Sequence, residues 1–377
     1  MHFMVTRESF VDSLPNAKDV NEHYAFIESC AARDEIDTLR TLFDQTRERC
    51  SFGPSDWAPR AACERIVEAL ALTAGFEHAT AALELSRITG NRGDSSHFRS
   101  SAVISKLVAA QSSSVLEQLL ECGYDLESDA LILHEAVVRR KLTPESRPAR
   151  DAANRLASAQ HPLAFLPLVL LDIEAELLLP QYGMGSSGTS MPFGTLSDDM
   201  AGESQDVDDE LTLTETTTHD RSNRISAAVK NWEAESNGLI EARTFDMRYR
   251  TMPILPRLLP RVGLECIGPA DAGFFHDDIP VKDIFTVLFS AASTGGAYNY
   301  GEFAAYGRLL AWRSLAGLLG CHENASIEET AVRALDSKWC LFSSSSDWYY
   351  QVAWDIGVAC LNPTQNELVI LGATDTD

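Results

Sequence analysis

The sequence predicts an α+β protein that is mainly α-helical, with an N-terminal helical-hairpin array followed by a helix-backed antiparallel sheet domain. Three observations predict it: helical spacing of apolar residues in the first half, an acidic polar stretch in the middle, and two-residue alternation near the C-terminus. A chain of 377 residues exceeds the size at which one core usually keeps growing. We therefore expect domains at residues 1–182 and 222–377, joined by a linker at residues 183–221.

The first half is predicted to consist of successive helices. In residues 34–49 the apolar side chains recur at helical spacing: Ile36, Leu39, Leu42 and Phe43. The same period continues through the next segments, which are separated by Gly- and Ser-containing loops. Residues 115–137 resemble one ankyrin repeat, but no further unit follows at a period of about 33 residues. A generic array of helical hairpins is therefore expected.

The stretch at residues 183–221 differs in composition from the rest of the chain. Gly, Ser, Thr, Asp and Glu dominate it, and its apolar residues are isolated. Such a composition does not bury enough apolar surface to offset the entropy of ordering. The sequence thus predicts an acidic disordered linker here.

The second half is predicted to contain helices and then strands. Residues 239–249 alternate apolar with polar side chains, which argues a strand. Helices are predicted at residues 224–236, 253–264, 281–292, 302–319 and 326–337, the last opened by a Ser326–Glu329 capping box. Final strands are expected at residues 339–342, 349–361 and 368–374, in a sheet of three or four strands. Alternate apolar side chains from Trp348 to Cys360 are expected to form one face of the middle strand.

The charge and the N-terminal sequence limit the partners and the location. The net charge of −24, without a Lys/Arg-rich run, argues against binding nucleic acid or an anionic membrane surface. It favours a basic protein partner. The first residues carry charges and lack the apolar core of a signal peptide, so we expect a cytoplasmic location.

The eight cysteines predict neither a disulfide framework nor a metal site. They are scattered, with no CxxC pair and no zinc-finger spacing, so free thiols and no metal or other cofactor are expected. Cys321 and His322 form the one adjacent Cys/His pair, and a site there would need ligands from afar such as His276 or Asp277. The sequence His276–Asp277–Asp278 offers an acid/base or metal alternative, but we favour a surface loop with Asp278 as a helix cap.

The glycine-containing segment that begins at Ser293 is the candidate ligand-binding site. It lies between two predicted helices, and its hydroxyl and backbone amides are placed to donate to an anion, with arginines supplying charge. The candidate residues are Thr294, Gly295, Gly296, Asn299, Arg308 and Arg313. The segment lacks the Gly-Lys-Ser/Thr ending of a Walker loop, and no strand precedes it as in a dinucleotide fingerprint. The alternative, which we favour, is a helix connection whose tyrosines cover the edge of the core.

Three segments of the second half resemble a known family: residues 241–245, residues 295–313 with their Gly-Gly-Ala-Tyr-Asn and Tyr-Gly-Arg motifs, and residues 348–377. They are similar to a bacterial family known mainly as a domain of unknown function. The resemblance covers the C-terminal half. It implies a bacterial cytoplasmic setting and carries over no catalytic residue or cofactor.

Two functional hypotheses remain open from the sequence. The first is an interaction or regulatory protein, such as an immunity-type protein, that binds a basic protein partner through its helical array. The alternative is an enzyme or small-molecule sensor with an anion- or nucleotide-binding site at residues 293–313. Ser-centred catalysis has no support, since no Gly-x-Ser-x-Gly motif occurs, and no catalytic residue can be assigned.

Overall fold

The structure is a computed structural model of the 377-residue chain. It describes residues 5–50, 56–90, 100–189, 192, 196, 198–199, 211–250, 253–269, 272–362, 364 and 366–376. The chain divides into two compact units. Unit 1 comprises Met1–Ala164 and Pro180–Gly188, and unit 2 comprises Phe165–Leu179 and Thr189–Asp377.

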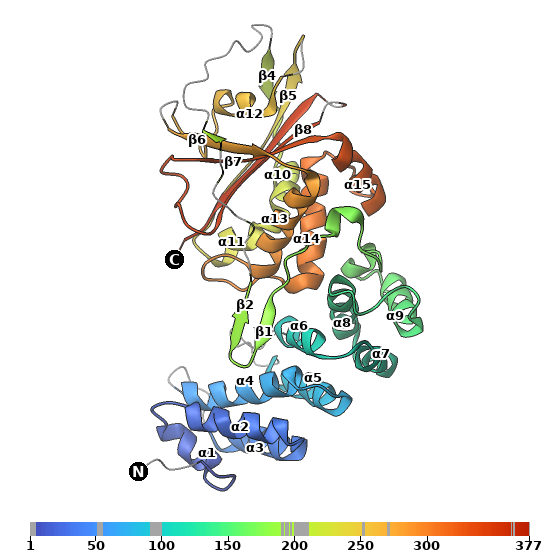
Figure 1. Ribbon diagram of the computed structural model, residues 1–377, viewed down its shortest axis with the longest axis vertical. Helices are drawn as coiled ribbons and strands as arrows, with labels where there is room; N and C mark the ends of the chain where they lie inside the picture. The colour runs from blue at the N-terminus through green and yellow to red at the C-terminus, as the bar shows by residue number, and fades with distance from the viewer. Residues whose placement is uncertain are drawn as a thin grey trace. The chain divides into compact units, whose positions relative to one another are not determined.

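Unit 1 is the predicted helical array (Figure 1). Its helices are α1 (Phe10–Ser13), α2 (Asn21–Ala32), α3 (Ile36–Arg49), α4 (Trp57–Leu72), α5 (Phe76–Gly90), α6 (Ser100–Ala110), α7 (Ser113–Cys122), α8 (Leu126–Val138) and α9 (Arg147–Ser158), with a 3-10 turn η1 (Leu14–Asn16). Leu39, Leu42 and Phe43 are fully buried, as their spacing on α3 predicts. Ser112 caps the start of helix α7, which ends at Cys122, and the next residue, Gly123, has a φ of 61°.

A short hairpin belongs to unit 1 although it overlaps the predicted linker. Its strands are β1 (Gln181–Gly183) and β2 (Ser186–Gly188). The Tyr182 hydroxyl lies 2.8 Å from Ser105 Oγ, and burial raises the pKa of Tyr182 to about 12. Gly185 N donates to Glu68 Oε2 on α4 at 3.1 Å. The chain therefore has regular structure where the linker was expected to begin.

Unit 2 contains a seven-stranded antiparallel sheet among the described residues, with strand order β3-β6-β7-β8-β9-β5-β4. The strands are β3 (Asp198–Asp199), β4 (Thr212–Glu215), β5 (Leu239–Arg248), β6 (Phe274–Asp278), β7 (Lys338–Ser344), β8 (Asp355–Asn362) and β9 (Glu367–Thr374). The α+β class is confirmed, and the sheet is larger than the three or four strands predicted. Strands β3 and β4 come from the predicted linker, while residues 190–191, 193–195, 197 and 200–210 lie outside the described residues.

Helices cover both faces of this sheet. The helical segments of unit 2 are η3 (Asp172–Glu174), α10 (His219–Ile225), η4 (Ser226–Ala228), α11 (Lys230–Glu235), α12 (Leu255–Leu258), η5 (Leu259–Arg261), α13 (Val281–Thr294), α14 (Phe303–Leu318) and α15 (Ile327–Asp336), and η2 (Pro162–Phe165) crosses the unit boundary. Helices α13 and α14 lie on one side and α12 on the other (Figure 1). On the α12 side, a buried cluster includes Phe245, Leu258, Phe342 and Ile370.

The middle strand of the predicted sheet is shorter than expected. It begins at Asp355, whereas the prediction began at residue 349. Gln351 has a φ of 59°, a left-handed conformation that interrupts an extended backbone. Its Nε2 donates to Ser344 O at 2.8 Å, which fixes the turn. The apolar alternation from Trp348 to Cys360 therefore does not form one continuous face.

A membrane-spanning helix was not found among the described residues, because none is both long and apolar enough.

Candidate anion-binding site

The glycine loop, residues 295–302, connects α13 to α14. Gly295 ends α13 with a φ of 81°. Gly296 N donates to Asn299 Oδ1 at 2.5 Å, and Asn299 Nδ2 donates to Asn231 O at 2.6 Å. Thr294 Oγ1 instead donates to Ser290 O of its own helix, at 2.7 Å. The structure thus brings Gly296 and Asn299 together and turns the Thr294 hydroxyl away from the loop.

The glycine loop does bind an anionic group, but that group belongs to the chain itself. Ala297 N donates to Asp375 Oδ2 at 2.7 Å, and Asn237 N and Ser236 Oγ donate to Asp375 Oδ1 at 3.1 and 3.0 Å. A Cβ on Gly296 would lie 1.9 Å from Asp375 Oδ2, so the close approach requires glycine. The buried carboxylate of Asp375 occupies the position that the sequence assigned to an external anion.

Arg308, predicted as a charge partner for that loop, instead forms a buried ion pair. Its Nε and Nη2 donate to Glu174 Oε1 and Oε2 at 2.5 and 3.0 Å, and both side chains are fully buried. Its remaining donors reach Pro167 O and Val169 O, each at 2.9 Å. Trp312 Nε1 also donates to Glu174 Oε1, at 2.9 Å. Arg308 therefore fixes residues 167–174 against α14, the packing role that the favoured interpretation gave it, and it does not supply charge to the glycine loop as the candidate site required.

Arg313 lies on the exposed side of α14, beside a cavity of about 490 Å³ in unit 2. We call this cavity the α14 cavity. Helices α10, α14 and α15 and the turn before α15 form its walls. The lining residues are Phe165, Asn223, Arg224, Ala227, Leu310, Trp312, Arg313, Ala316, His322, Glu323, Ala325, Ile327 and Thr330.

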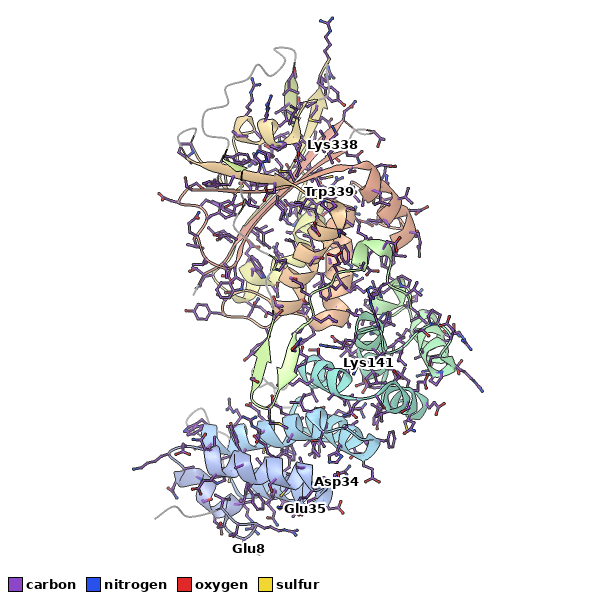
Figure 2. The ribbon with its side chains drawn as sticks, viewed as in Figure 1. Glu8, Asp34, Glu35, Lys141, Lys338 and Trp339 are labelled. Atoms are coloured by element: carbon purple, nitrogen blue, oxygen red, sulfur yellow. The ribbon has the colours of Figure 1, made fainter. Side chains whose placement is uncertain are left out.

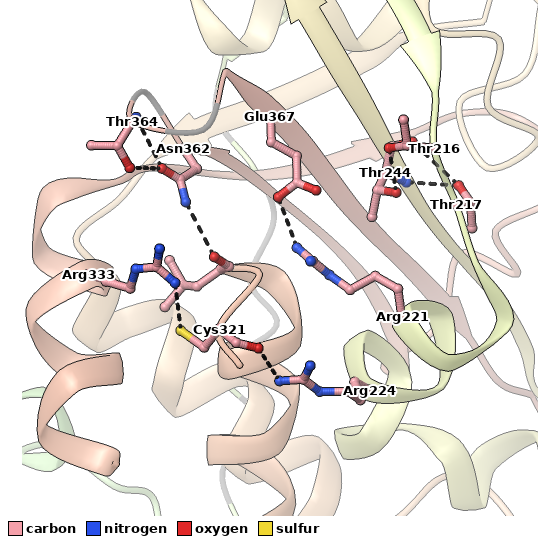
Figure 3. Close-up of polar contacts among 11 residues, drawn as sticks. Thr216, Thr217, Arg221, Arg224, Thr244, Cys321, Arg333, Asn362, Thr364 and Glu367 are labelled. Atoms are coloured by element: carbon pink, nitrogen blue, oxygen red, sulfur yellow. Dashed lines mark hydrogen bonds and ion pairs between the residues drawn. The ribbon is translucent and has the colours of Figure 1, made fainter. Parts of the chain in front are cut away.

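Two guanidinium groups of the α14 cavity have no carboxylate partner among the described residues. Arg224 Nη2 donates to the backbone oxygen of Cys321 at 2.6 Å (Figure 3). Arg313 forms no ion pair with another described residue. By contrast, Arg221 on the same helix as Arg224 pairs with Glu367 Oε2 at 2.9 Å. Uncompensated guanidinium groups beside a concave apolar surface attract anions.

The turn before α15 adds a third donor to the α14 cavity. Asn324 N donates to His322 Nδ1 at 3.3 Å, so a neutral His322 carries its proton on Nε2. The turn is held in part by Arg333, whose Nη1 lies 3.7 Å from Cys321 Sγ (Figure 3). The exposed carboxylate of Glu323 also lines the cavity. Cys321 and His322 are not brought into a group of three metal-ligand residues among the described ones.

Sequence reasoning found Arg313 but missed its neighbours. Arg224 comes from α10, roughly ninety positions earlier in the chain, and Phe165 comes from a segment that was assigned to the other domain. Neither residue carries a motif that could have connected it to Arg313.

The comparisons with known proteins identify a family but no function. No curated protein and no solved structure matches the chain. A family model described as a family of unknown function matches residues 21–377. The match extends through the helical array, so the resemblance predicted for the C-terminal half alone was too narrow. The chain belongs to this family, DUF6183.

Proposed function

We propose that this protein binds a small organic anion in the α14 cavity. The observation that carries the proposal is that Arg224 and Arg313 both line this one cavity. Neither has a carboxylate partner among the described residues, although the net charge of the chain is −24. The cavity volume of about 490 Å³ lies in the range of small-molecule sites, roughly 300–1,000 Å³. Guanidinium groups bind carboxylates and phosphates with two parallel hydrogen bonds.

The lining specifies the chemistry of the ligand. A carboxylate or phosphate suits the two arginines and the Nε2–H of His322, while an apolar or aromatic body suits the side chains of Phe165 and Ile327. Glu323 is placed to accept a hydrogen bond from a hydroxyl or amine of the same ligand. The described lining residues provide recognition groups without a paired nucleophile and base, so the arrangement supports a binding protein or sensor.

A ligand screen tests this proposal. Thermal shift and calorimetry with nucleotides, sugar phosphates and aromatic carboxylates should find a saturable ligand, which at 100 times its Kd stabilises the protein by about 2.7 kcal/mol. Arg313→Gln and Arg224→Gln should each weaken that binding, whereas Arg261→Gln, at an exposed arginine on η5, should not. If no ligand binds, or if all three variants bind equally, the cavity does not have this function.

A basic protein partner is the second candidate, and a different surface of unit 2 favours it. On α15, Val332 is 62% exposed and Leu335 is 72% exposed, and Ile254, 53% exposed, lines a cavity of about 460 Å³ together with Leu335. Lys338 and Trp339 line the same cavity. Figure 2 labels both residues at the start of β7. Exposed acids on α15 flank this apolar surface: Glu328, Glu329 and Asp336. In an interaction or immunity-type role, this surface would bind an apolar side chain of the partner that is flanked by basic residues.

Co-purification from source cells at low ionic strength tests the second candidate. Leu335→Asp should lose a stoichiometric basic partner that the wild-type protein retains. Tyr298→Ser is the control, because Tyr298 is 64% exposed in the glycine loop and is not among the residues that line the cavity beside Leu335. A partner that both variants retain would place the interface elsewhere.

A further inference from the structure

Three side chains of different chemistry meet on one face of the β6–β7 pair. They are His276 and Asp278 of β6 and Cys340 of β7, and their ligand-type atoms all lie within 4.8 Å of one another. Asp278 is paired directly with Cys340 in the strand register. His276 lies two residues before Asp278, and alternate residues of a strand share a face. The backbone pairing therefore places imidazole, carboxylate and thiol together.

The sequence did not predict this group. It favoured a surface loop with Asp278 as a helix cap over an acid/base or metal role for His276–Asp278. These residues instead form strand β6, and α13 begins after Pro280. Cys340 is 62 positions beyond Asp278 and shares no motif with it. Only the β6–β7 register shows that the three residues are neighbours.

A buried nitrogen atom of this group has no hydrogen-bond partner among the described residues. His276 Nδ1 is buried and makes no hydrogen bond with a described residue. A buried imidazole nitrogen without a partner is unfavourable, and coordination of a cation by this atom would supply the missing interaction. The buried thiol of Cys340 donates to Leu341 O at 3.1 Å. A metal ion bound to Cys340 Sγ would therefore change the environment of this thiol, as it would that of His276 Nδ1.

We propose that His276, Asp278 and Cys340 bind a divalent transition-metal ion, with Zn²⁺ as the preferred ion. Nitrogen, oxygen and sulfur ligands together select zinc over calcium or magnesium, which bind oxygen ligands. Three protein ligands leave a fourth tetrahedral position for water or another ligand. Zinc bond lengths of about 2.0–2.3 Å require ligand atoms about 3.5 Å apart, so the side chains must close by about 1 Å from their present limit of 4.8 Å.

The surroundings of the three residues support a metal site. Hydrogen bonding between β6 and β7 fixes the backbone of all three ligands, so only side-chain torsions must adjust. Cys340 belongs to the buried apolar cluster with Phe274 and Phe342, and the Phe274 ring lies 6.1 Å from the ring of His276. These apolar neighbours surround the Cys340 side of the group, whereas the Asp278 side chain is exposed and gives an ion access from solvent.

Metal titration of the full-length protein tests the proposal. After dialysis against a chelator, the wild-type protein should bind one equivalent of Zn²⁺ in competition with a chromophoric chelator. His276→Ala, Asp278→Asn and Cys340→Ala should each weaken binding by at least about tenfold. With Co²⁺, the wild-type protein should show thiolate-to-cobalt charge-transfer absorption, and Cys340→Ala should lose it.

Two matched variants separate metal binding from a general effect on the sheet. Asp277→Asn changes the neighbouring carboxylate of β6 on the opposite face, and Cys360→Ala removes a buried thiol from β8. Cys360 pairs with Trp339, so it faces away from Cys340. Both variants should keep wild-type zinc affinity. If Cys340→Ala does not fold, Cys340→Ser replaces it in the comparison. Equal affinity of wild-type and Cys340 variants, or cobalt spectra without thiolate absorption, overturns the proposal.

Discussion

Replacing Arg308 by methionine removes the cation from a carboxylate that has no access to solvent. Glu174 and Arg308 are both 0% exposed, and two hydrogen bonds of 2.5 and 3.0 Å join them. Methionine keeps an unbranched side chain but leaves the Glu174 charge uncompensated and the carbonyls of Pro167 and Val169 without their donor. Breaking a buried pair in this way costs about 3–5 kcal/mol. Against a total stability of about 5–15 kcal/mol, this is a large part.

Urea unfolding followed by tryptophan fluorescence measures the loss, because Trp232 and Trp312 are both buried in unit 2. Arg313→Met is the matched control on the same helix, and its exposed side chain should change the free energy of unfolding by no more than about 0.5 kcal/mol. Adding Glu174→Gln to Arg308→Met should recover part of the loss. An Arg308→Met loss below about 1 kcal/mol, or one equal to that of Arg313→Met, would refute the reasoning.

Two further predictions concern a close approach and a buried imidazole. Gly296→Ala should displace Asp375 from Ala297 N and lower the free energy of unfolding by more than about 1 kcal/mol. Gly188→Ala is the control, because a Cβ at residue 188 meets nothing within 4 Å and should leave the free energy of unfolding unchanged. Equal urea midpoints for the two variants would contradict this prediction. Burial lowers the pKa of His23 below 6.5, so the folded state binds fewer protons than the unfolded state. The stability that neutral His23 contributes is present above pH 6.5 and is lost as the pH falls through the lowered pKa. Thermal unfolding of unit 1 should therefore show a smaller pH dependence in His23→Gln than in wild type, and identical slopes would exclude the effect.

The sequence predicts local structure well where the apolar spacing alone decides it. The burial of Leu39, Leu42 and Phe43 follows from helical spacing, and the Ser326–Glu329 capping box opens α15 as predicted. At residue 351 the prediction failed, because a left-handed backbone and a tertiary hydrogen bond outweigh the apolar alternation.

The candidate site shows what sequence alone could not determine. The chemistry assigned to the glycine loop, backbone amides that bind an anion, is present, but the anion is the carboxylate of Asp375, 78 positions after Ala297. Likewise, nothing in the sequence pairs Arg308 with Glu174, 134 positions earlier. Long-range pairing decides which polar groups are already satisfied, and hence which arginines remain available for a ligand.

The order of segments along the chain determines where the protein can be divided. Met1–Ala164 and Pro180–Gly188 belong to unit 1, while the intervening Phe165–Leu179 belongs to unit 2. A C-terminal fragment starting at residue 222, the boundary that composition suggests, lacks Glu174 and leaves Arg308 as a buried cation without a counter-ion. Such a fragment should aggregate or fold poorly on expression. Separating the units requires Phe165–Leu179 to be rejoined to the remainder of unit 2, for example by a designed linker to residue 189.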